Sequence, residues 1–238
     1  MKKALIICLC IGGCAYLYLN FSKEPEKAQI TQNEYIHEKI DEVQYLKTEI
    51  EDDDDWQLRL INAKNPVPQE YTLEVAILKN GNKVDERIYP FLKEMFDDAR
   101  AAGMYPVVTS GYRTNAEQKK LYDDKIEEYL LEGYSEIEAI KLTEKFLANP
   151  GTSEHEMAIA VDIVGDWMKS SSAEVYDWLK SHAHEYGFIL RYPENKNHIT
   201  GINYEPWHYR FVGVDAAKEI YEQNITLEEF CQLKGEKY

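Results

Sequence analysis

Two separated segments of the sequence carry residue types that bind metal ions. The first holds His155 and Asp162, seven residues apart, and the second holds Glu205 and His208, three residues apart. Each pair alone could occur by chance in an acidic chain. Together, two histidines and one carboxylate would supply three ligands of a tetrahedral zinc site and leave the fourth position for water. The pattern therefore predicts a catalytic site with about one zinc ion per chain.

Backbone preferences assign different roles to the two carboxylates. Asp162 lies in a predicted buried strand, where an unpaired carboxylate is costly and a cation explains its presence. Glu205 precedes a proline, which favours an extended backbone over the helix of a zincin motif. In an extended segment Glu205 and His208 point to opposite faces unless a bend intervenes, so Glu205 can reach the metal's water without binding the metal. We predict His155, Asp162 and His208 as zinc ligands. Glu205 is then the general base.

Turn signals and apolar periodicity predict the elements that must position these residues. Asn80-Gly81 is typical of a β-hairpin between Tyr71–Lys79 and Lys83–Ile88. Capping-box patterns at Thr114 and Ser135 start two helices. Strands and helices mix without regular βαβ alternation, which favours an α+β domain with a small, largely antiparallel sheet flanked by helices. The other expected strands are 106–109, 159–164, 188–191 and 207–212, and the expected helices are 88–99, 114–130, 135–148, 173–186, 214–222 and 226–233.

The N-terminal segment predicts an association with the cell membrane. Two lysines precede an apolar run, Ala4–Phe21, of about the length of a membrane span, and they would stay on the cytoplasmic side. Cys14 ends a segment that resembles a lipoprotein cleavage box, so a lipidated form and simple secretion remain alternatives to an uncleaved anchor. We expect residues 1–21 to be an anchor or signal segment, 22–55 an acidic spacer with a short helix, and 56–238 an extracytoplasmic catalytic domain.

Composition limits the possible functions. The 238 residues are 44% hydrophobic and 12% aromatic, which is enough for a packed core and excludes wholesale disorder. With 27 basic and 43 acidic residues, the net charge of −16 would repel nucleic acid. Cys231 is the single cysteine of the body, so no disulfide is expected within the predicted domain.

Four spaced motifs resemble those of the VanY-type zinc D-alanyl-D-alanine carboxypeptidases. The resemblance extends from about Leu58 to Val214 and implies that family's DD-peptidase/hedgehog-like fold. One departure is Ala158, where the family usually has glycine, and it puts the shape of the loop between the ligands in doubt. The matching segments are Ser110-Gly111-Tyr112-Arg113 with Gln118 after it, Ser153-x-His155, Ala160-x-Asp162 and Glu205-Pro206-Trp207-His208-Tyr209-Arg210.

The resemblance implies a function and roles for individual residues. The zinc ligands and base would be those predicted above, and Arg113 would hold or polarise the substrate near the scissile bond. Gln118, Ser153, Tyr112 and Trp207 would contact the substrate, expected to be the C-terminal D-alanine of peptidoglycan stem peptides. Two alternatives remain: an L,D-carboxypeptidase or endopeptidase on the same scaffold, and a wall-binding domain without catalysis.

Overall fold

The computed structural model describes residues 56–69 and 71–235. The predicted anchor (1–21), which contains Cys14, and the predicted spacer (22–55) with its helix lie outside the described residues. Among the helices that are described, none combines the length and the apolar character needed to cross a membrane.

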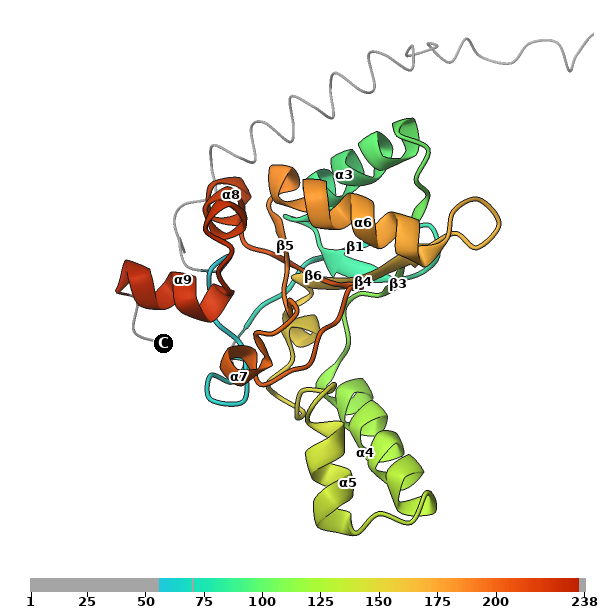
Figure 1. The fold of residues 1–238 in the computed structure, drawn as a ribbon, viewed down its shortest axis with the longest axis vertical. Helices are drawn as coiled ribbons and strands as arrows, with labels where there is room; N and C mark the ends of the chain where they lie inside the picture. Colours follow the sequence, from blue (N-terminus) through green and yellow to red (C-terminus); the bar gives the residue numbers. More distant parts are fainter. Residues whose placement is uncertain (1–55, 70, 236–238) are drawn as a thin grey trace, which may run out of the picture. The chain divides into compact units, whose positions relative to one another are not determined.

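A four-stranded sheet forms the centre of the domain, with strand order β3-β4-β6-β5 (Figure 1). All three strand pairs are antiparallel. The expected α+β class with a small antiparallel sheet is therefore confirmed. The strands are β3 (Pro106–Ser110), β4 (Ala160–Gly165), β5 (Phe188–Leu190) and β6 (His208–Phe211).

The predicted hairpin is present, but its strands are shorter than expected. β1 (Val75–Ile77) and β2 (Lys83–Asp85) form a separate two-stranded sheet. Most of the missing residues lie at the open end of the hairpin, where the chain after β2 turns toward the next helix and the backbone N–H of Ile88 donates to the carbonyl oxygen of Asp85 at 3.2 Å. The loop itself is bound to the main sheet. The side-chain amides of Asn80 and Asn82 donate hydrogen bonds to the carbonyl oxygen of Val108 on β3, at 2.7 and 2.9 Å.

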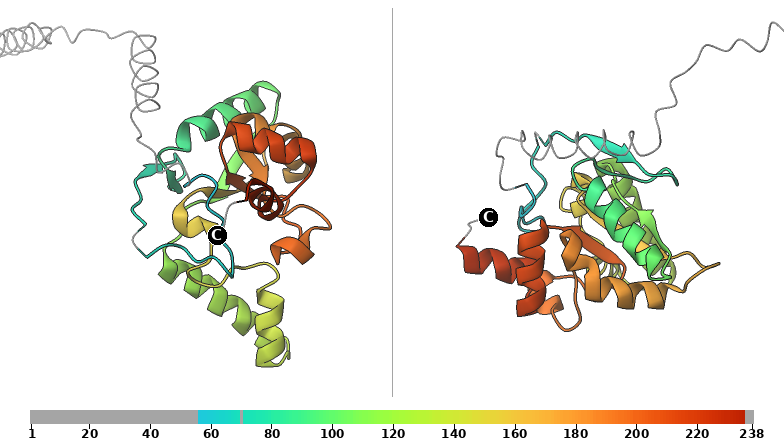
Figure 2. Two further views of the ribbon diagram at one scale, coloured as in Figure 1. Left: turned by 90° about the vertical axis from the view of Figure 1, so that its left-hand side faces the viewer. Right: turned by 90° about the horizontal axis from the view of Figure 1, so that it is seen from above.

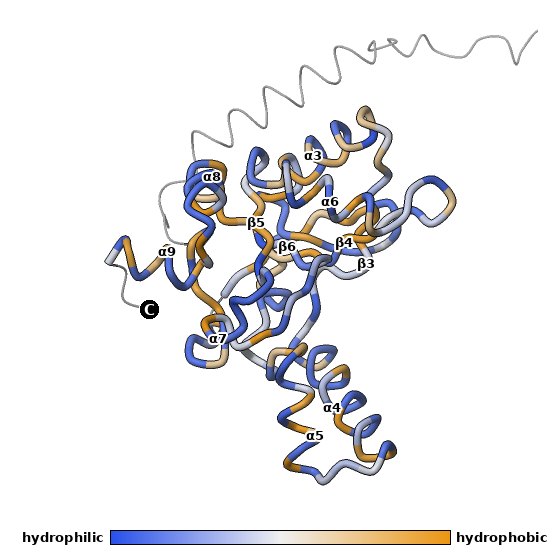
Figure 3. Tube along the Cα trace, in the orientation of Figure 1, coloured by the Kyte–Doolittle hydropathy of each residue, from blue (hydrophilic) through white to orange (hydrophobic). Residues whose placement is uncertain are grey.

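Helices α3 (Tyr89–Ala101) and α6 (Ser172–His182) cover one face of the central sheet (Figures 1 and 2). Val161 and Ile163 of β4 are fully buried in the core that these helices share with the sheet. Hydrophobic segments along β4 and β5 lie in the same core and are orange in Figure 3. Because successive residues of a strand face opposite sides, Asp162 points to the other face of the sheet.

A helical hairpin projects from the domain on the side away from α3 and α6 (Figure 1). Its two helices, α4 (Asn115–Leu131) and α5 (Glu136–Thr143), begin with the capping boxes expected from the sequence. α5 ends about five residues before the predicted end at residue 148. After Thr143 the chain continues in tighter turns, in which the backbone N–H of Phe146 donates to the carbonyl oxygen of Thr143 at 3.0 Å, instead of in α-helix.

The C-terminal helices pack on a second apolar cluster, separate from the main core. Ile189 and Val212 contribute to this cluster from the sheet side, and Leu227 and Phe230 contribute from the last helix. The predicted helix 173–186 is α6 followed by a tighter 3₁₀ turn. The remaining elements are η1 (Glu154–Met157), η2 (Ala183–Tyr186), α7 (Asn197–Thr200), α8 (Val214–Gln223) and α9 (Leu227–Lys234).

Candidate active site

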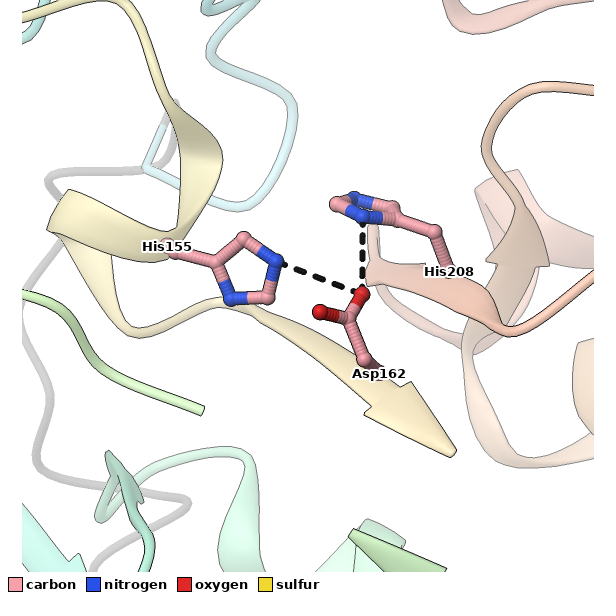
Figure 4. A group of neighbouring side chains, drawn as sticks. All are labelled: His155, Asp162 and His208. Carbon is pink, nitrogen blue, oxygen red and sulfur yellow. Dashed lines mark ion pairs between the residues drawn. The ribbon is translucent and has the colours of Figure 1, made fainter. Parts of the chain in front are cut away.

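The three predicted metal ligands come together on the sheet face away from α3 and α6. Asp162 of β4 is paired in register with His208 of β6, so their side chains point to the same side. His155 reaches them from η1, which precedes β4 (Figure 4). Asp162 Oδ1 lies 3.4 Å from His155 Nε2 and 3.2 Å from His208 Nδ1.

The donor atoms of this cluster fit a metal ion. One donor atom from each of His155, Asp162 and His208 lies within 4.8 Å of the others. His155 Nε2 and Asp162 Oδ1 are buried and have no hydrogen-bond partner. A buried unpaired polar atom costs about 1–3 kcal/mol, which a shared cation would offset. In the part of the chain that the structure describes, no other group of three such side chains converges in this way.

Hydrogen bonds on the far side of each ring fix which nitrogen faces the cluster. His155 Nδ1 donates to the carbonyl oxygen of Gly111 at 2.7 Å, which leaves Nε2 free to bind a metal. His208 Nε2 faces Glu154 Oε2 at 3.4 Å, which leaves Nδ1 toward Asp162. Such outer partners orient metal-binding histidines. A Cβ at position 111 would lie 2.2 Å from the carbonyl oxygen of Lys83, so only glycine lets this segment pack against β2.

Glu154 is a functional candidate that the sequence interpretation missed. Its carboxylate is buried and forms ion pairs with Arg191 at 2.7 Å and Arg210 at 2.8 Å. Burial raises the pKa of Glu154, but the two arginines outweigh it and hold that pKa well below its usual range. One indication of this contact was present in the sequence. Arg210 lies two residues after His208 in the same strand, so both side chains face the same side of the sheet.

Glu205 lies beside the ligand cluster because the chain turns before β6. The backbone N–H of His208 donates to the carbonyl oxygen of Glu205 at 3.2 Å. This bend corrects the expectation of a fully extended segment, and it brings Glu205 Oε2 to 3.7 Å from His208 Nδ1. Burial raises the pKa of Glu205 to about 7, and Asp162 adds to the rise while His208 and Arg113 oppose it. A carboxylate with a pKa near neutrality suits a general base.

The cluster opens into a hollow of about 420 Å³. The structure brings four of the five other predicted site residues to its wall: Arg113, Gln118, Ser153 and Trp207. Tyr112 is not among the residues that line the hollow, so its role as a substrate contact stays a prediction. Its backbone N–H is instead bonded to the carbonyl oxygen of Lys83 in β2.

Arg113 is held by three side chains beside the predicted metal ligands. Its guanidinium donates to Gln118 Oε1 at 2.5 Å, to Ser110 Oγ at 3.1 Å and to Asp162 Oδ2 at 3.4 Å. Burial lowers the pKa of Arg113, while the nearby carboxylates of Asp162 and Glu205 oppose this shift. Gln118 also binds the carbonyl oxygen of Ala148, so its side chain orients Arg113 and the loop after α5.

Replacing Arg113 by lysine is expected to lower kcat/KM by roughly 100-fold, the loss typical of removing one donor to a developing oxyanion. A lysine has no planar fork, so it cannot keep these contacts and also face a substrate. Steady-state kinetics would measure the change, with Arg100→Lys on exposed α3 as the matched control. Equal kinetics in Arg113→Lys and wild type would show that a positive charge at this position is sufficient and that the planar guanidinium is not needed.

Comparison with known proteins tests the family resemblance. A sequence profile described as D-alanyl-D-alanine carboxypeptidase (VanY) matches residues 81–214, more than half of the chain. The chain belongs to the VanY family. A D-alanyl-D-alanine carboxypeptidase of Enterococcus faecalis is 48% identical over 183 residues, which cover 77% of this chain and 68% of that protein. The expected family and enzyme class are therefore confirmed.

Solved structures resemble this VanY-type chain over most of the described domain. VanYB in complex with D-alanine-D-alanine is 47% identical, with a TM-score of 0.73 over 74% of this chain and 98% of that one. A VanY D,D-pentapeptidase variant in complex with Zn(II) is 48% identical, with a TM-score of 0.72 and the same coverage of both chains. The L,D-carboxypeptidase LdcB is 30% identical, with a TM-score of 0.64 over 75% of this chain and 87% of that one.

Ala158, the departure from the family's usual glycine, keeps the conformation that glycine would favour. Its φ is +57°, in the left-handed region, and its side chain is fully buried. The carbonyl oxygen of Ala158 accepts a hydrogen bond from the backbone N–H of Asp85 at 3.0 Å. The loop therefore retains its tight turn between the first two ligands despite the added methyl group.

Proposed function

We propose that this VanY-type chain is a zinc-dependent carboxypeptidase that removes the C-terminal D-alanine from peptidoglycan stem peptides. One observation carries the proposal: the unpartnered donor atoms of His155 and Asp162 converge with His208 Nδ1 beside a buried glutamate, Glu205, in an open hollow. The similarity to a VanY bound to Zn(II) and to VanYB bound to D-alanine-D-alanine supports the metal and the substrate class.

The chemistry follows from the positions of the chain's own groups. A bound zinc ion supplies a Lewis acid and lowers the pKa of a water molecule to about 7. Glu205 is placed to accept a proton from the attacking water and to return it to the leaving amino group of D-alanine as the peptide bond breaks. Arg113 donates N–H groups to the developing oxyanion or to the terminal carboxylate of the peptide. Ser153 and Trp207 line the space left for the peptide.

The test is hydrolysis of defined stem peptides by the purified protein, followed by mass spectrometry. The proposal expects pentapeptide stems to lose one alanine, and it expects a chelator to abolish the reaction until zinc is restored. An unchanged pentapeptide in the presence of bound zinc would refute it. Cleavage of tetrapeptide stems alone would instead establish the L,D-carboxypeptidase alternative, which rests on the lower similarity to LdcB.

A catalytically inactive wall-binding domain is the weaker alternative. A domain that only binds has no need for Glu205, whose burial at 4% exposure carries an energetic cost. Zinc binding without turnover of either stem length would favour this alternative.

We also propose that the catalytic domain works outside the cytoplasm, tethered to the cell membrane by residues 1–21. The two lysines and the apolar run that follows them support this topology. The acidic spacer, residues 22–55, should stay away from anionic membrane surfaces by like-charge repulsion and keep the domain free to meet stem peptides. Fractionation of cells expressing the full chain tests the proposal, and recovery in the cytoplasmic fraction would contradict it.

A further inference from the structure

A row of buried charged side chains lies behind His208. Glu154 faces His208 Nε2 at 3.4 Å and accepts hydrogen bonds from Arg191 Nε at 2.7 Å and Arg210 Nη1 at 2.8 Å. Arg191 also donates through both terminal nitrogens to Glu228, at 2.9 and 2.7 Å. We call Glu154, Arg191, Arg210 and Glu228 the buried charge network.

The network is almost completely buried, and its charges cancel. The arginine side chains are 0% exposed, Glu154 is 1% exposed and Glu228 is 14% exposed. Two carboxylates face two guanidinium groups, so the network adds no net charge next to the predicted metal ligands. Apolar side chains of similar volume often stabilise a fold as well as buried ion pairs do, so stability alone is a weak reason for this arrangement. Its contact with His208 indicates a role at the site.

The network also reaches parts of the chain outside the segment matched by the family profile, residues 81–214. Glu228 belongs to α9, which Leu227 and Phe230 fix to the second apolar cluster. At the other end of the domain, Arg210 Nη2 donates to the carbonyl oxygens of Gln57 and Arg59, at 2.8 and 2.9 Å. Segments from both ends of the described domain therefore converge on Glu154.

We infer that α9 is part of the support of the metal site: Glu228, acting through Arg191 and Glu154, fixes the ring of His208 so that Nδ1 faces Asp162. Glu154 and Glu228 are positioning residues, because neither touches the reacting atoms. A carboxylate on the second nitrogen of a ligating histidine holds the ring and raises its basicity. The inference rests on the proposed function, which makes His208 a zinc ligand.

Zinc affinity, measured by chelator competition on the full chain, tests the inference. Glu154→Gln is expected to weaken zinc binding by about 10- to 100-fold, the range for outer partners of metal ligands. Glu228→Gln, one step further away, is expected to weaken it by roughly 3- to 10-fold, below that range. The matched control is Glu229→Gln, the next residue of α9, which pairs with Lys196 and can keep its capping box as glutamine. Its zinc affinity should equal that of wild type.

Two further measurements separate positioning from general stability. A purely structural role would lower the melting temperature of the zinc-free protein and leave the zinc dissociation constant of the folded protein unchanged. The visible spectrum of the Co(II)-substituted protein reports ligand geometry, and it should change in Glu154→Gln and stay unchanged in Glu229→Gln. If Glu154→Gln does not fold, Glu228→Gln decides the question, and wild-type zinc affinity in that folded variant overturns the inference.

The outcome also distinguishes this inference from the proposed function. Full zinc affinity in His208→Ala would overturn the assignment of the ligands, and with it the inference. Loss of zinc in His208→Ala, together with wild-type affinity in both glutamine variants of the network, would overturn the inference alone.

Discussion

Replacement of Glu205 by glutamine is expected to lower kcat by at least roughly 100-fold, the contribution typical of a general base. The amide has nearly the same shape as the carboxylate but cannot accept a proton from water. The carboxylate of Glu205 is buried at the wall of the hollow, with Oε2 3.7 Å from His208 Nδ1. An exposed carboxylate elsewhere cannot easily take over the role of Glu205. Steady-state hydrolysis of a pentapeptide stem measures the loss.

The zinc content of the same variant distinguishes a base from a ligand. Zinc should remain at the wild-type level in Glu205→Gln, because the donor atoms that converge come from three other residues. Glu194→Gln, an exposed position in the loop between β5 and α7, is the matched control and should keep full activity. Loss of zinc would make Glu205 a ligand, and undiminished kcat with zinc bound would remove it from the mechanism.

Single replacement of His155, Asp162 or His208 by alanine is expected to abolish both zinc binding and turnover. Each change removes one of three ligands whose donor atoms lie within 4.8 Å of one another, and a structural or catalytic zinc site needs at least three protein ligands. Metal analysis of the wild-type protein should find about one zinc ion per chain.

His184→Ala is the matched control for these three variants. The ring of His184 stacks on the ring of Tyr221, with 3.7 Å between their centroids. His184 is not one of the predicted metal ligands, so its replacement should not change the zinc content. Circular dichroism would confirm that each variant is folded. Full zinc occupancy in all three ligand variants would refute the assignment.

Much of the fold could be predicted from short stretches of sequence. The capping boxes at Thr114 and Ser135 mark the starts of α4 and α5 correctly, because a cap and its partner are three residues apart. The ends of elements were less predictable. α5 gives way to tighter turns after Thr143, and the hairpin ladder ends where the chain turns from β2 toward α3.

The candidate ligands and the candidate base could also be identified from sequence, because each motif is local and its residue types are suited to zinc. His155, Asp162, His208 and Glu205 all lie where that interpretation places them, around one hollow. Trp207 and Ser153 line the same hollow, whereas Tyr112 does not. The direction of a side chain near a turn depends on the hydrogen bonds of the backbone, and a sequence motif does not show where those bonds are made.

The sequence by itself determined which residues can bind zinc, activate water and cap the helices. Only the tertiary structure decided how those residues are held. Glu154 meets Arg191 and Arg210 across 37 and 56 residues of sequence, and Glu205 turns toward His208 instead of away from it. The physical reason is that a buried charge is stable only beside its partner, and the partner is chosen by packing of the whole chain.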